Sequence, residues 1–239
     1  MIVYHFISSE FALKALRDRR LKISRINELN DPFQFCAEGY SDSDTQVKLE
    51  AFKNQMNARY GVICFSGAYQ DPVLWSHYAD HHRGVALVFE IPDDQAIAIN
   101  YQPERFHWDV DAAIQRGGFS ESDLSKLIAT KFSSWCYENE IRMMCGLNDH
   151  FCQIDAKGKK FYFESLSLES FGVDALKLIG LIRGTLCDLT PMDIASELLA
   201  ADALSVQDTQ MDLSSFRIIS GKTYPVNGVR SFSACCFRV

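Results

Sequence analysis

The stretch D-P-V-L-W-S-H-Y-A-D-H-H-R-G-V-A-L-V-F-E, from Asp71 to Glu90, carries signals for both ends of a short helix and for the strand that follows it. Asp71 is a residue type that caps helices, and Pro72 suits the first helical position. Gly84 is expected to close the helix in a left-handed conformation before a strand from Val85 to Phe89. The order helix, tight turn, strand is therefore predicted here.

Helical spacing of three and four residues places Trp75, Tyr78 and His82 along one side of this helix. Such a stripe can line a pocket, and it can equally consist of core aromatics, because large aromatic side chains are most often simply buried. His77 and His81 have an i,i+4 spacing that is compatible with a metal ion, but no third ligand is evident. We therefore expect no metal site.

The composition bounds the class of protein. The chain has 239 residues, of which 47% are hydrophobic, and its net charge is -7. An acidic chain of this kind argues against broad binding to nucleic acid or to an anionic membrane, since both need a basic footprint. One basic cluster can either face phosphates or form a solvated surface, as charge runs usually do. It consists of Arg17, Arg19, Arg20, Lys22 and Arg25.

A cytoplasmic, soluble protein is expected. No apolar run is long enough to cross a bilayer, and the N-terminus M-I-V-Y-H-F has neither a basic leader nor a cleavage site. The cysteines are irregularly spaced and include no C-x-x-C pair, which favours reduced thiols over zinc ligands or disulfides. They are Cys36, Cys64, Cys136, Cys145, Cys152, Cys187, Cys235 and Cys236.

The periodicity predicts one α+β domain over residues 1–239, with mixed or mostly antiparallel sheets flanked by helices. Short strands outnumber helices and often follow one another directly, and no glycine-rich phosphate loop is present. The expected strands are 2–6, 21–24, 62–66, 85–89, 135–145, 160–164 and 175–182. The expected helices cover 8–19, 45–60, 120–130 with Ser120 as its cap, and 191–201 capped by Thr190.

A strand from Trp135 to Cys145 would place Cys136, Glu138, Glu140 and Arg142 on one face. Two carboxylates beside a guanidinium can hold a ribose hydroxyl and stabilise positive charge developing on a sugar carbon. The alternative is a surface strand or helix in which Glu138 and Arg142 form an ordinary i,i+4 ion pair. Spacing alone leaves both interpretations open.

Four motifs in order resemble a large bacterial family that is catalogued only as domain-of-unknown-function family 2971. They are N-D-P-F at Asn30 to Phe33, C-F-S at Cys64 to Ser66, L-W-S-H-Y-A followed by R-G-V between Leu74 and Val85, and K-x-x-x-W-x-Y-E-x-E-x-R from Lys131 to Arg142. The resemblance covers about residues 1–220, and four ordered motifs are more specific than any one of them.

That family is in turn similar to the ADP-ribosyltransferases, which bind NAD on a split antiparallel sheet without a glycine-rich loop. The resemblance implies that His5, in Y-H-F, helps to hold NAD and that Tyr78, together with Trp75, stacks on its nicotinamide. It also implies a cofactor-binding role for Ser66, at the end of C-F-S.

The same resemblance makes Glu140 and Glu138 the catalytic pair. Glu140 would grip the nicotinamide ribose and favour an oxocarbenium-like transition state, while Arg142 would lower the pKa of Glu140 and keep it ionised. N-D-P-F has no counterpart in the well-studied transferases, so Asn30 and Asp31 are expected to hold a structural turn against the pocket.

The sequence is compatible with three functions. The first is an NAD-dependent ADP-ribosyltransferase or NAD glycohydrolase in a toxin or phage-defence setting, which modifies a macromolecule of unknown identity. The second is a catalytically inert nucleotide- or ligand-binding module in which Trp75, Tyr78 and His77 form a sensor pocket. The third is a hydrolase with His77 or His82 as general base, which no nucleophile motif supports.

Overall fold

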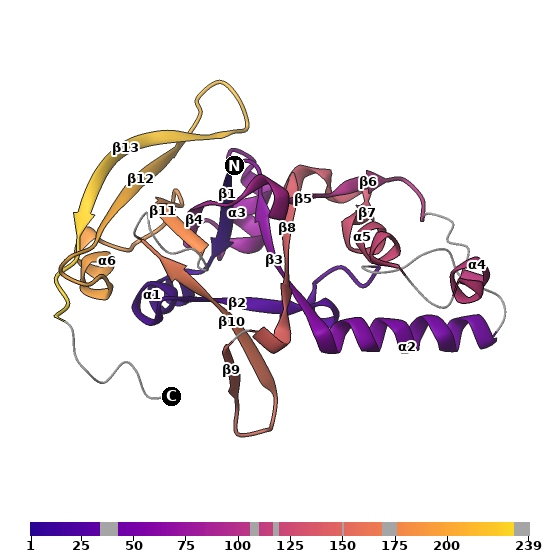
Figure 1. The fold of residues 1–239 in the computed structure, drawn as a ribbon. Helices are drawn as coiled ribbons and strands as arrows, with labels where there is room; N and C mark the ends of the chain where they lie inside the picture. Colours follow the sequence, from indigo (N-terminus) through magenta and orange to yellow (C-terminus); the bar gives the residue numbers. More distant parts are fainter. Residues whose placement is uncertain (34–42, 106–109, 117–119, 150, 169–175, 232–239) are drawn as a thin grey trace. The chain divides into compact units, whose positions relative to one another are not determined.

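The computed structural model of the chain describes residues 1–33, 43–105, 110–116, 120–149, 151–168 and 176–231 (Figure 1). The helices are α1 (Ser9–Asp18), α2 (Ser43–Arg59), α3 (Pro72–Tyr78), α4 (Val110–Gln115), α5 (Glu121–Ala129) and α6 (Pro191–Glu197). Short 3-10 helices are η1 (Ile26–Glu28), η2 (Asp93–Gln95), η3 (Ser133–Glu138) and η4 (Leu147–Asp149). The strands are β1 (Ile2–Ile7), β2 (Arg20–Arg25), β3 (Tyr60–Ser66), β4 (Val85–Glu90), β5 (Ile97–Ala98), β6 (Asn100–Gln102), β7 (Thr130–Phe132), β8 (Glu140–Gly146), β9 (Phe151–Ile154), β10 (Lys160–Ser167), β11 (Leu176–Arg183), β12 (Ala203–Met211) and β13 (Ile218–Asn227).

The pairing of the strands confirms the predicted α+β class with a large mixed, mostly antiparallel sheet. Strand β1 pairs antiparallel with β3 and β4, β4 with β11, and β12 with β13. Parallel pairing joins β11 to β10 and β12, and β6 to β7. Antiparallel neighbours need only short connections, which explains why few crossover helices were expected from the sequence.

Contacts divide the chain into two compact units. Unit 1 comprises Met1–Leu21, Phe65–Asp93 and Phe163–Val239, and unit 2 comprises Lys22–Cys64 and Asp94–Tyr162. Strands β2, β3 and β10 each continue from one unit into the other, as the bounds of both show. The units are therefore parts of one α+β domain, and each is described within its own bounds.

In unit 1 the strands follow the order β13-β12-β11-β4-β1-β3. Strand β4 reads V-A-L-V-F-E, and the side chains of Val85, Ala86, Leu87 and Phe89 are all fully buried. A continuous apolar run of this kind is typical of a strand covered on both faces. Ala86 of this strand belongs to a core cluster that also contains Trp75, Ala79, Ile182 and Ile218.

In unit 2 the first part of β3 pairs with β2, at Ser24 opposite Val62, and β3 also pairs with β8. Strand β8 pairs in turn with β5, at Ile97 opposite Arg142. Helices α2 and α5 supply most of the apolar core of this unit, which consists of Ile26, Phe52, Met56, Val62, Leu124, Leu127 and Ile128. The short strands β6 and β7 form a separate two-stranded ribbon.

The stretch from Asp71 to Glu90 folds as predicted at its start. The Asp71 carboxylate accepts a hydrogen bond from the Val73 N–H at 2.8 Å, and Pro72 is the first residue of α3. The prediction for the helix end was wrong, because the left-handed backbone falls on Asp80, His81 and His82, with φ of 45°, 53° and 69°. Aspartate and histidine tolerate this conformation better than most residues.

Gly84 is needed for a different reason from the one predicted. A Cβ atom at this position would lie 2.3 Å from the Ile7 carbonyl oxygen, so only glycine permits the close approach of this turn to β1. Since α3 ends at Tyr78, His82 lies outside the helix and the predicted stripe reduces to Trp75 and Tyr78. His77 and His81 also do not share a helix, which removes their i,i+4 geometry.

Two further helix starts are confirmed with complete capping boxes. Ser120 caps α5, where its hydroxyl accepts from the Asp123 N–H and the Asp123 carboxylate accepts from the Ser120 N–H. Thr190 and Asp193 repeat the arrangement at α6. At α1, Ser8 has the extended backbone of an N-cap but makes no side-chain capping bond.

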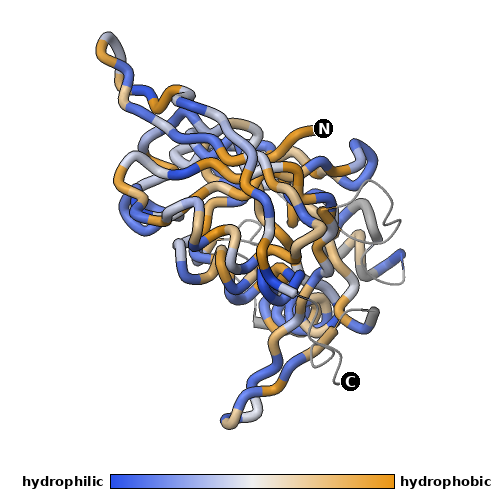
Figure 2. The backbone as a smooth tube through the Cα atoms, turned by 90° about the vertical axis from the view of Figure 1, so that its left-hand side faces the viewer, coloured by the Kyte–Doolittle hydropathy of each residue, from blue (hydrophilic) through white to orange (hydrophobic). Residues whose placement is uncertain are grey.

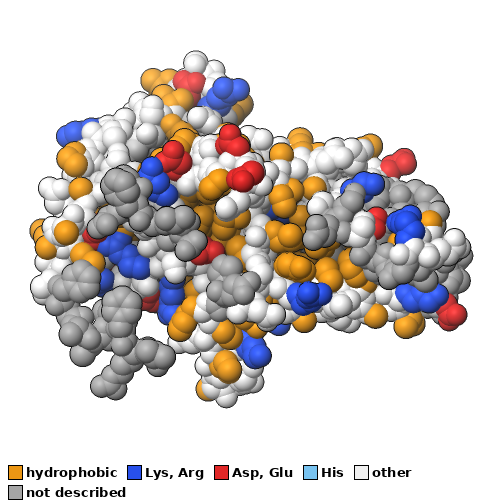
Figure 3. All heavy atoms as spheres, viewed as in Figure 1, with side chains coloured by type: hydrophobic (Ala, Val, Ile, Leu, Met, Phe, Trp, Pro, Cys, Tyr) orange, Lys and Arg blue, Asp and Glu red, His pale blue; other side chains and the backbone are white. Residues whose placement is uncertain are grey.

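Two hairpins carry exposed apolar side chains. The turn between β12 and β13 exposes Leu213 and Phe216 almost completely, and Phe151 and Ile154 are exposed on β9. Hydrophilic and hydrophobic residues are mixed along both hairpins in Figure 2, and all four residues of β9 are exposed. Figure 3 shows apolar and charged side chains mixed at the tip of the β12–β13 hairpin. No helix in the described ranges is long and apolar enough to cross a membrane.

Candidate functional site

The strand predicted from Trp135 to Cys145 begins only at Glu140, so that prediction was wrong for its first half. Residues Ser133–Glu138 form the 3-10 helix η3 instead. Asn139 then adopts a left-handed conformation with φ of 43°, which asparagine tolerates, and its N–H donates to the Cys136 carbonyl at 3.2 Å. Glu138 and Glu140 therefore come from two different elements, while Glu140 and Arg142 share one face of β8.

Four charged side chains of unit 2 meet in the interior, and we call Lys131, Glu138, Glu140 and Arg142 the charge cluster. The Lys131 ammonium lies 3.0 Å from Glu140 Oε2 and also contacts Glu138 Oε2. Arg142 donates to both oxygens of Glu140, from Nε to Oε1 at 2.7 Å and from Nη2 to Oε2 at 3.0 Å. Each of the four residues is at most 6% exposed.

The charge cluster is fixed from several sides. Arg142 Nη1 donates to the Ile128 carbonyl at 2.6 Å, and the Tyr101 hydroxyl accepts from the Glu140 N–H at 2.8 Å. The Lys131 ammonium lies 4.8 Å from the centre of the Trp135 ring, a cation–π distance. These bonds hold the Glu140 carboxylate in one orientation.

The formal charges of the cluster sum to zero, as two cations face two carboxylates. Burial by itself raises the pKa of Glu140, but the nearby guanidinium of Arg142 and ammonium of Lys131 outweigh it and lower the pKa to about 2. The predicted effect of Arg142 on Glu140 is thus confirmed. Burial raises the pKa of Tyr101 to about 12, so its hydroxyl stays protonated at neutral pH.

Cys64, from the C-F-S motif, lies in the electrostatic field of the Glu140 carboxylate. Burial and the Glu140 carboxylate both raise the pKa of its thiol. A thiol that stays protonated is a poor nucleophile, so Cys64 supports the carboxylate and is not suited to attack a substrate.

The arrangement supplies an ionised, oriented carboxylate in a low-dielectric setting, which is what the stabilisation of a developing cation requires. Both oxygens of Glu140 already have cationic partners, however. Oε1 accepts from Arg142, and Oε2 accepts from Arg142 and Lys131, so a ligand hydroxyl that takes the place of Lys131 at Oε2 would meet a carboxylate still held by Arg142. Lys131 is the partner that can leave most easily, because its ammonium would keep its contact with Glu138.

The remaining predicted site residues belong to unit 1. Trp75 is fully buried, meets Phe6 edge to face at 5.0 Å between ring centroids, and donates its indole N–H to the Tyr69 carbonyl at 2.6 Å. Trp75 is therefore a core residue, which is the second of the two interpretations given for the stripe of Trp75, Tyr78 and His82. Tyr78 is half-buried, with its ring 6.0 Å from that of His77.

His5 and Ser66 lie on neighbouring strands of unit 1, since Tyr4 is paired with Ser66. His5 is half-buried and meets the Phe65 ring edge-on at 6.0 Å. The Ser66 hydroxyl donates to the Ala68 carbonyl at 2.7 Å and accepts from the Ala68 N–H at 3.2 Å. Ser66 thus closes a local turn after β3.

Lys131 is the residue that sequence reasoning missed, although it stands first in the quoted K-x-x-x-W-x-Y-E-x-E-x-R motif. The available signal was charge balance. Two carboxylates and one guanidinium leave one negative charge uncompensated, and a buried site has to neutralise it. Lys131 was the one lysine inside the motif.

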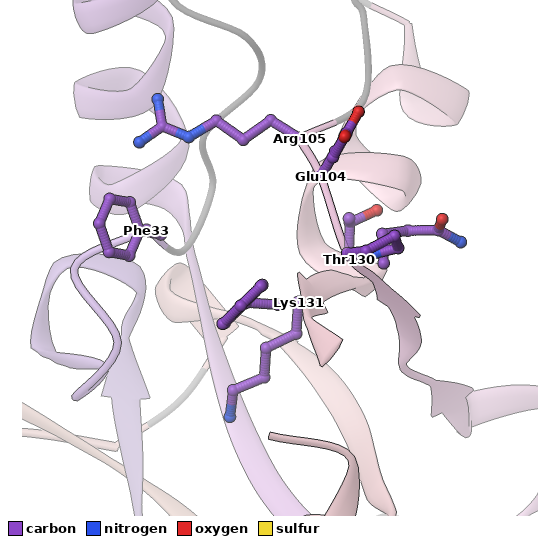
Figure 4. Close-up of a pocket in the computed structure, with 8 residues that line it drawn as sticks. Phe33, Glu104, Arg105, Thr130 and Lys131 are labelled. Carbon is purple, nitrogen blue, oxygen red and sulfur yellow. The ribbon is translucent and has the colours of Figure 1, made fainter. Parts of the chain in front are cut away.

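Unit 2 also contains a pocket of about 280 Å3 (Figure 4). Its wall includes Phe33, Gln102, Arg105, Thr130, Lys131 and Phe132. Figure 4 shows Arg105 extending towards Phe33, while Lys131 points away from Glu104. The stem of Lys131 therefore borders the pocket while its ammonium belongs to the charge cluster.

The N-D-P-F motif builds one side of this pocket. The Asp31 carboxylate, 3% exposed, accepts from the Phe33 N–H at 2.9 Å, which confirms a turn held by Asp31. Phe33 itself is 57% exposed and lines the pocket. No group of three or more potential metal ligands occurs among the residues that the structure describes.

Comparison with known proteins returned no matching family model, no matching curated protein and no matching solved structure. The resemblance to the uncharacterised bacterial family, and through it to a split-sheet ADP-ribosyltransferase, therefore stays a prediction.

Proposed function

We propose that this chain consumes NAD, either as an ADP-ribosyltransferase or as an NAD glycohydrolase, with Glu140 as the catalytic carboxylate. The observation that carries the proposal is the state of Glu140, which is ionised, buried and held by Arg142 at the start of β8. Such a carboxylate favours a transition state that develops positive charge beside it.

In the proposed reaction the bond between ribose C1′ and the nicotinamide nitrogen breaks, and its electron pair stays on nicotinamide. The oxocarbenium-like ribose is stabilised by Glu140, which also orients a ribose hydroxyl after Lys131 has moved aside. Water, or a nucleophile on a macromolecule, then bonds to C1′ and gives up a proton. Glu138 keeps the displaced Lys131 ammonium paired and is thus a positioning residue.

The unit 1 residues have supporting roles in this proposal. His5 would hold NAD, and Tyr78, which is partly exposed, would stack on nicotinamide. Trp75 is fully buried and would act through α3, by fixing the helix that carries Tyr78. Ser66 would contribute to NAD binding through the turn that it closes at the end of β3.

The cellular setting is part of the same proposal. None of the five cysteines in the described ranges, from Cys64 to Cys187, forms a disulfide, which supports a reducing, cytoplasmic location. Cys36, Cys235 and Cys236 lie outside those ranges. We propose a toxin or phage-defence role with a macromolecular acceptor, without broad binding to nucleic acid or membrane.

The test is nicotinamide release from NAD by the wild type and by Glu140→Gln, with and without cell extract as a source of acceptors. Wild type is expected to release nicotinamide and Glu140→Gln to lose at least about 100-fold in rate, as for the loss of one transition-state contact. Glu50→Gln, an equal change at an exposed residue of α2 that does not line the pocket, is the matched control and should retain activity.

Folding must be separated from catalysis. Glu140→Gln leaves one buried cation in excess, so the double variant Lys131→Met/Glu140→Gln, which keeps the cluster neutral, is measured beside it. A folded double variant without activity supports the proposal. Nicotinamide release at the wild-type rate by either variant would exclude Glu140 as the catalytic group.

The second candidate is a catalytically inert nucleotide- or ligand-binding module. The observation in its favour is that both oxygens of Glu140 are engaged by Lys131 and Arg142. An inert module predicts that a nucleotide raises the melting temperature by mass action while no nicotinamide is released under any condition.

A further inference from the structure

The pocket of unit 2 is lined by two exposed aromatic side chains and by a guanidinium. Phe33 is 57% exposed and Phe132 is 48% exposed, although both are large apolar residues. We infer that this pocket binds a planar aromatic ring bearing an anionic group, the chemistry of a nucleoside monophosphate. The inference deepens the proposed function, on whose use of a nucleotide it rests, by naming where one nucleotide binds.

The β6–β7 ribbon contributes to both this pocket and the charge cluster, and Lys131 borders both. Its register pairs Tyr101 with Lys131 and Gln102 with Phe132. Because side chains alternate along a strand, the first pair faces one side and the second pair the other. Tyr101 and the Lys131 ammonium bind Glu140, whereas Gln102 and Phe132 line the pocket.

Phe33 is held in place although its ring is exposed. The Asp31 carboxylate accepts from the N–H of Phe33 itself, and Pro32 restricts the chain between them. An exposed aromatic ring on a fixed backbone offers a stacking surface that loses little conformational entropy when a base binds to it. This gives the N-D-P-F motif a binding role in addition to its turn.

Arg105 supplies the anion-binding group. Its guanidinium lies over the Phe33 ring, 5.0 Å from the ring centre, and extends towards Phe33 in Figure 4. A guanidinium in this position can stack on a base and donate to phosphate oxygens. The Lys131 ammonium is already paired with Glu138 and Glu140, which leaves Arg105 as the cation that the pocket residues offer to a ligand.

The size of the pocket limits the ligand. A volume of about 280 Å3 lies just below the range for small-molecule sites, which is roughly 300–1,000 Å3. The pocket therefore suits one ring with its phosphate and not a complete dinucleotide. The ligand is either a free mononucleotide or the adenylate half of NAD.

Calorimetric titration of the wild type with AMP, adenosine, inorganic phosphate and NAD tests the inference. AMP should bind more tightly than adenosine or phosphate. Phe33→Ala and Phe132→Ala should each weaken AMP between about 5-fold and 100-fold, the effect of losing one base-stacking contact. Arg105→Gln should reduce the preference for AMP over adenosine, while Phe151→Ala, an exposed phenylalanine on β9, should have no effect.

The inference is overturned if AMP does not bind, if it binds no better than phosphate, or if Phe33→Ala and Phe132→Ala leave its affinity unchanged. Competition between AMP and NAD would assign the pocket to the adenylate half of NAD, and simultaneous binding would assign it to a separate mononucleotide. Nucleotide binding is measured without turnover. AMP binding that depends on Phe33, without nicotinamide release, would thus retain the pocket and reject the proposed catalysis.

Discussion

Units 1 and 2 fill their interiors with different chemistry. The core of unit 1 is apolar. Among the described residues of this unit, Glu197 is the one buried residue with a charged side chain. Its partner Arg17 reaches solvent, with half of its side chain exposed. Unit 2 instead buries the complete charge cluster of Lys131, Glu138, Glu140 and Arg142.

This difference indicates where to look for function. Removing four charges from water is costly, and a well-packed apolar group often stabilises a protein equally well or better. A buried charge cluster is therefore weak support for a purely stabilising role. Strongly shifted pKa values with specific charge partners are concentrated at functional sites, and Glu140 meets that description.

The largest expected effect compares one arginine in each unit. Arg142→Met leaves two buried carboxylates facing one ammonium and should lower the free energy of unfolding by about 3–5 kcal/mol. Arg17→Met removes a partly exposed pair in unit 1 and should cost less than about 1 kcal/mol. Urea unfolding gives the free energy of unfolding of both variants. Equal losses in the two variants would show that the buried charges of unit 2 are no more important for stability than the exposed ion pair of unit 1.

The next effect is the response to acid. Because the pKa of Glu140 is lowered from 4.5 to about 2, its ionised form stabilises the folded protein above pH 4.5, and this contribution disappears as the pH falls towards 2. The complete loss, reached below pH 2, should amount to about 3 kcal/mol, of which about 2 kcal/mol falls between pH 4.5 and about pH 3. Unfolding free energies between about pH 7 and pH 3 should fall less steeply in Glu140→Gln than in the wild type.

Glu197→Gln is the matched variant of unit 1. The hydrogen bond from Arg17 lowers the pKa of Glu197 as well, but solvent screens the exposed guanidinium. This variant should therefore change the acid response less than Glu140→Gln does. A larger change in the acid response of Glu197→Gln than of Glu140→Gln would mean that the acid-sensitive carboxylate lies in unit 1.

The smallest effect should be the same in both units. Ser120→Ala removes the capping box of α5 in unit 2, and Thr190→Ala removes that of α6 in unit 1. Each should cost about 1 kcal/mol in the free energy of unfolding. The free energy of unfolding of both variants is measured by thermal or urea unfolding. Similar losses would show that the two helix caps contribute equally and that the units differ in their buried charge. Very different losses would show that the units also differ in the stability of their helices.

Much of the fold was predictable, because local signals agreed with the tertiary structure. Asp71 with Pro72, Ser120 with Asp123, and the apolar run of β4 each specify an element through nearby atoms alone. The predictions failed where contacts between residues far apart in the sequence determine the structure. Gly84 is required by its approach to Ile7, which no local pattern reveals.

The candidate site was predictable only in part. Glu140 and Arg142 do share a strand face, but an alternating pattern was extended backwards through Trp135 and Cys136, which belong to η3. Lys131 and Phe33 could not be assigned from spacing, since their partners lie in other elements. The sequence contained the charge imbalance that required Lys131, but not the contact that satisfies it.

The two sides of the β6–β7 ribbon couple ligand binding in the pocket to ligand binding at Glu140. One side of it carries Tyr101 and Lys131, which bind Glu140, and the other carries Gln102 and Phe132. A ligand that shifts the ribbon from the Phe132 side therefore alters the contacts of Glu140 as well. Linkage makes such coupling reciprocal: by whatever factor a mononucleotide changes the affinity of the Glu140 site for its ligand, that ligand changes the affinity for the mononucleotide by the same factor.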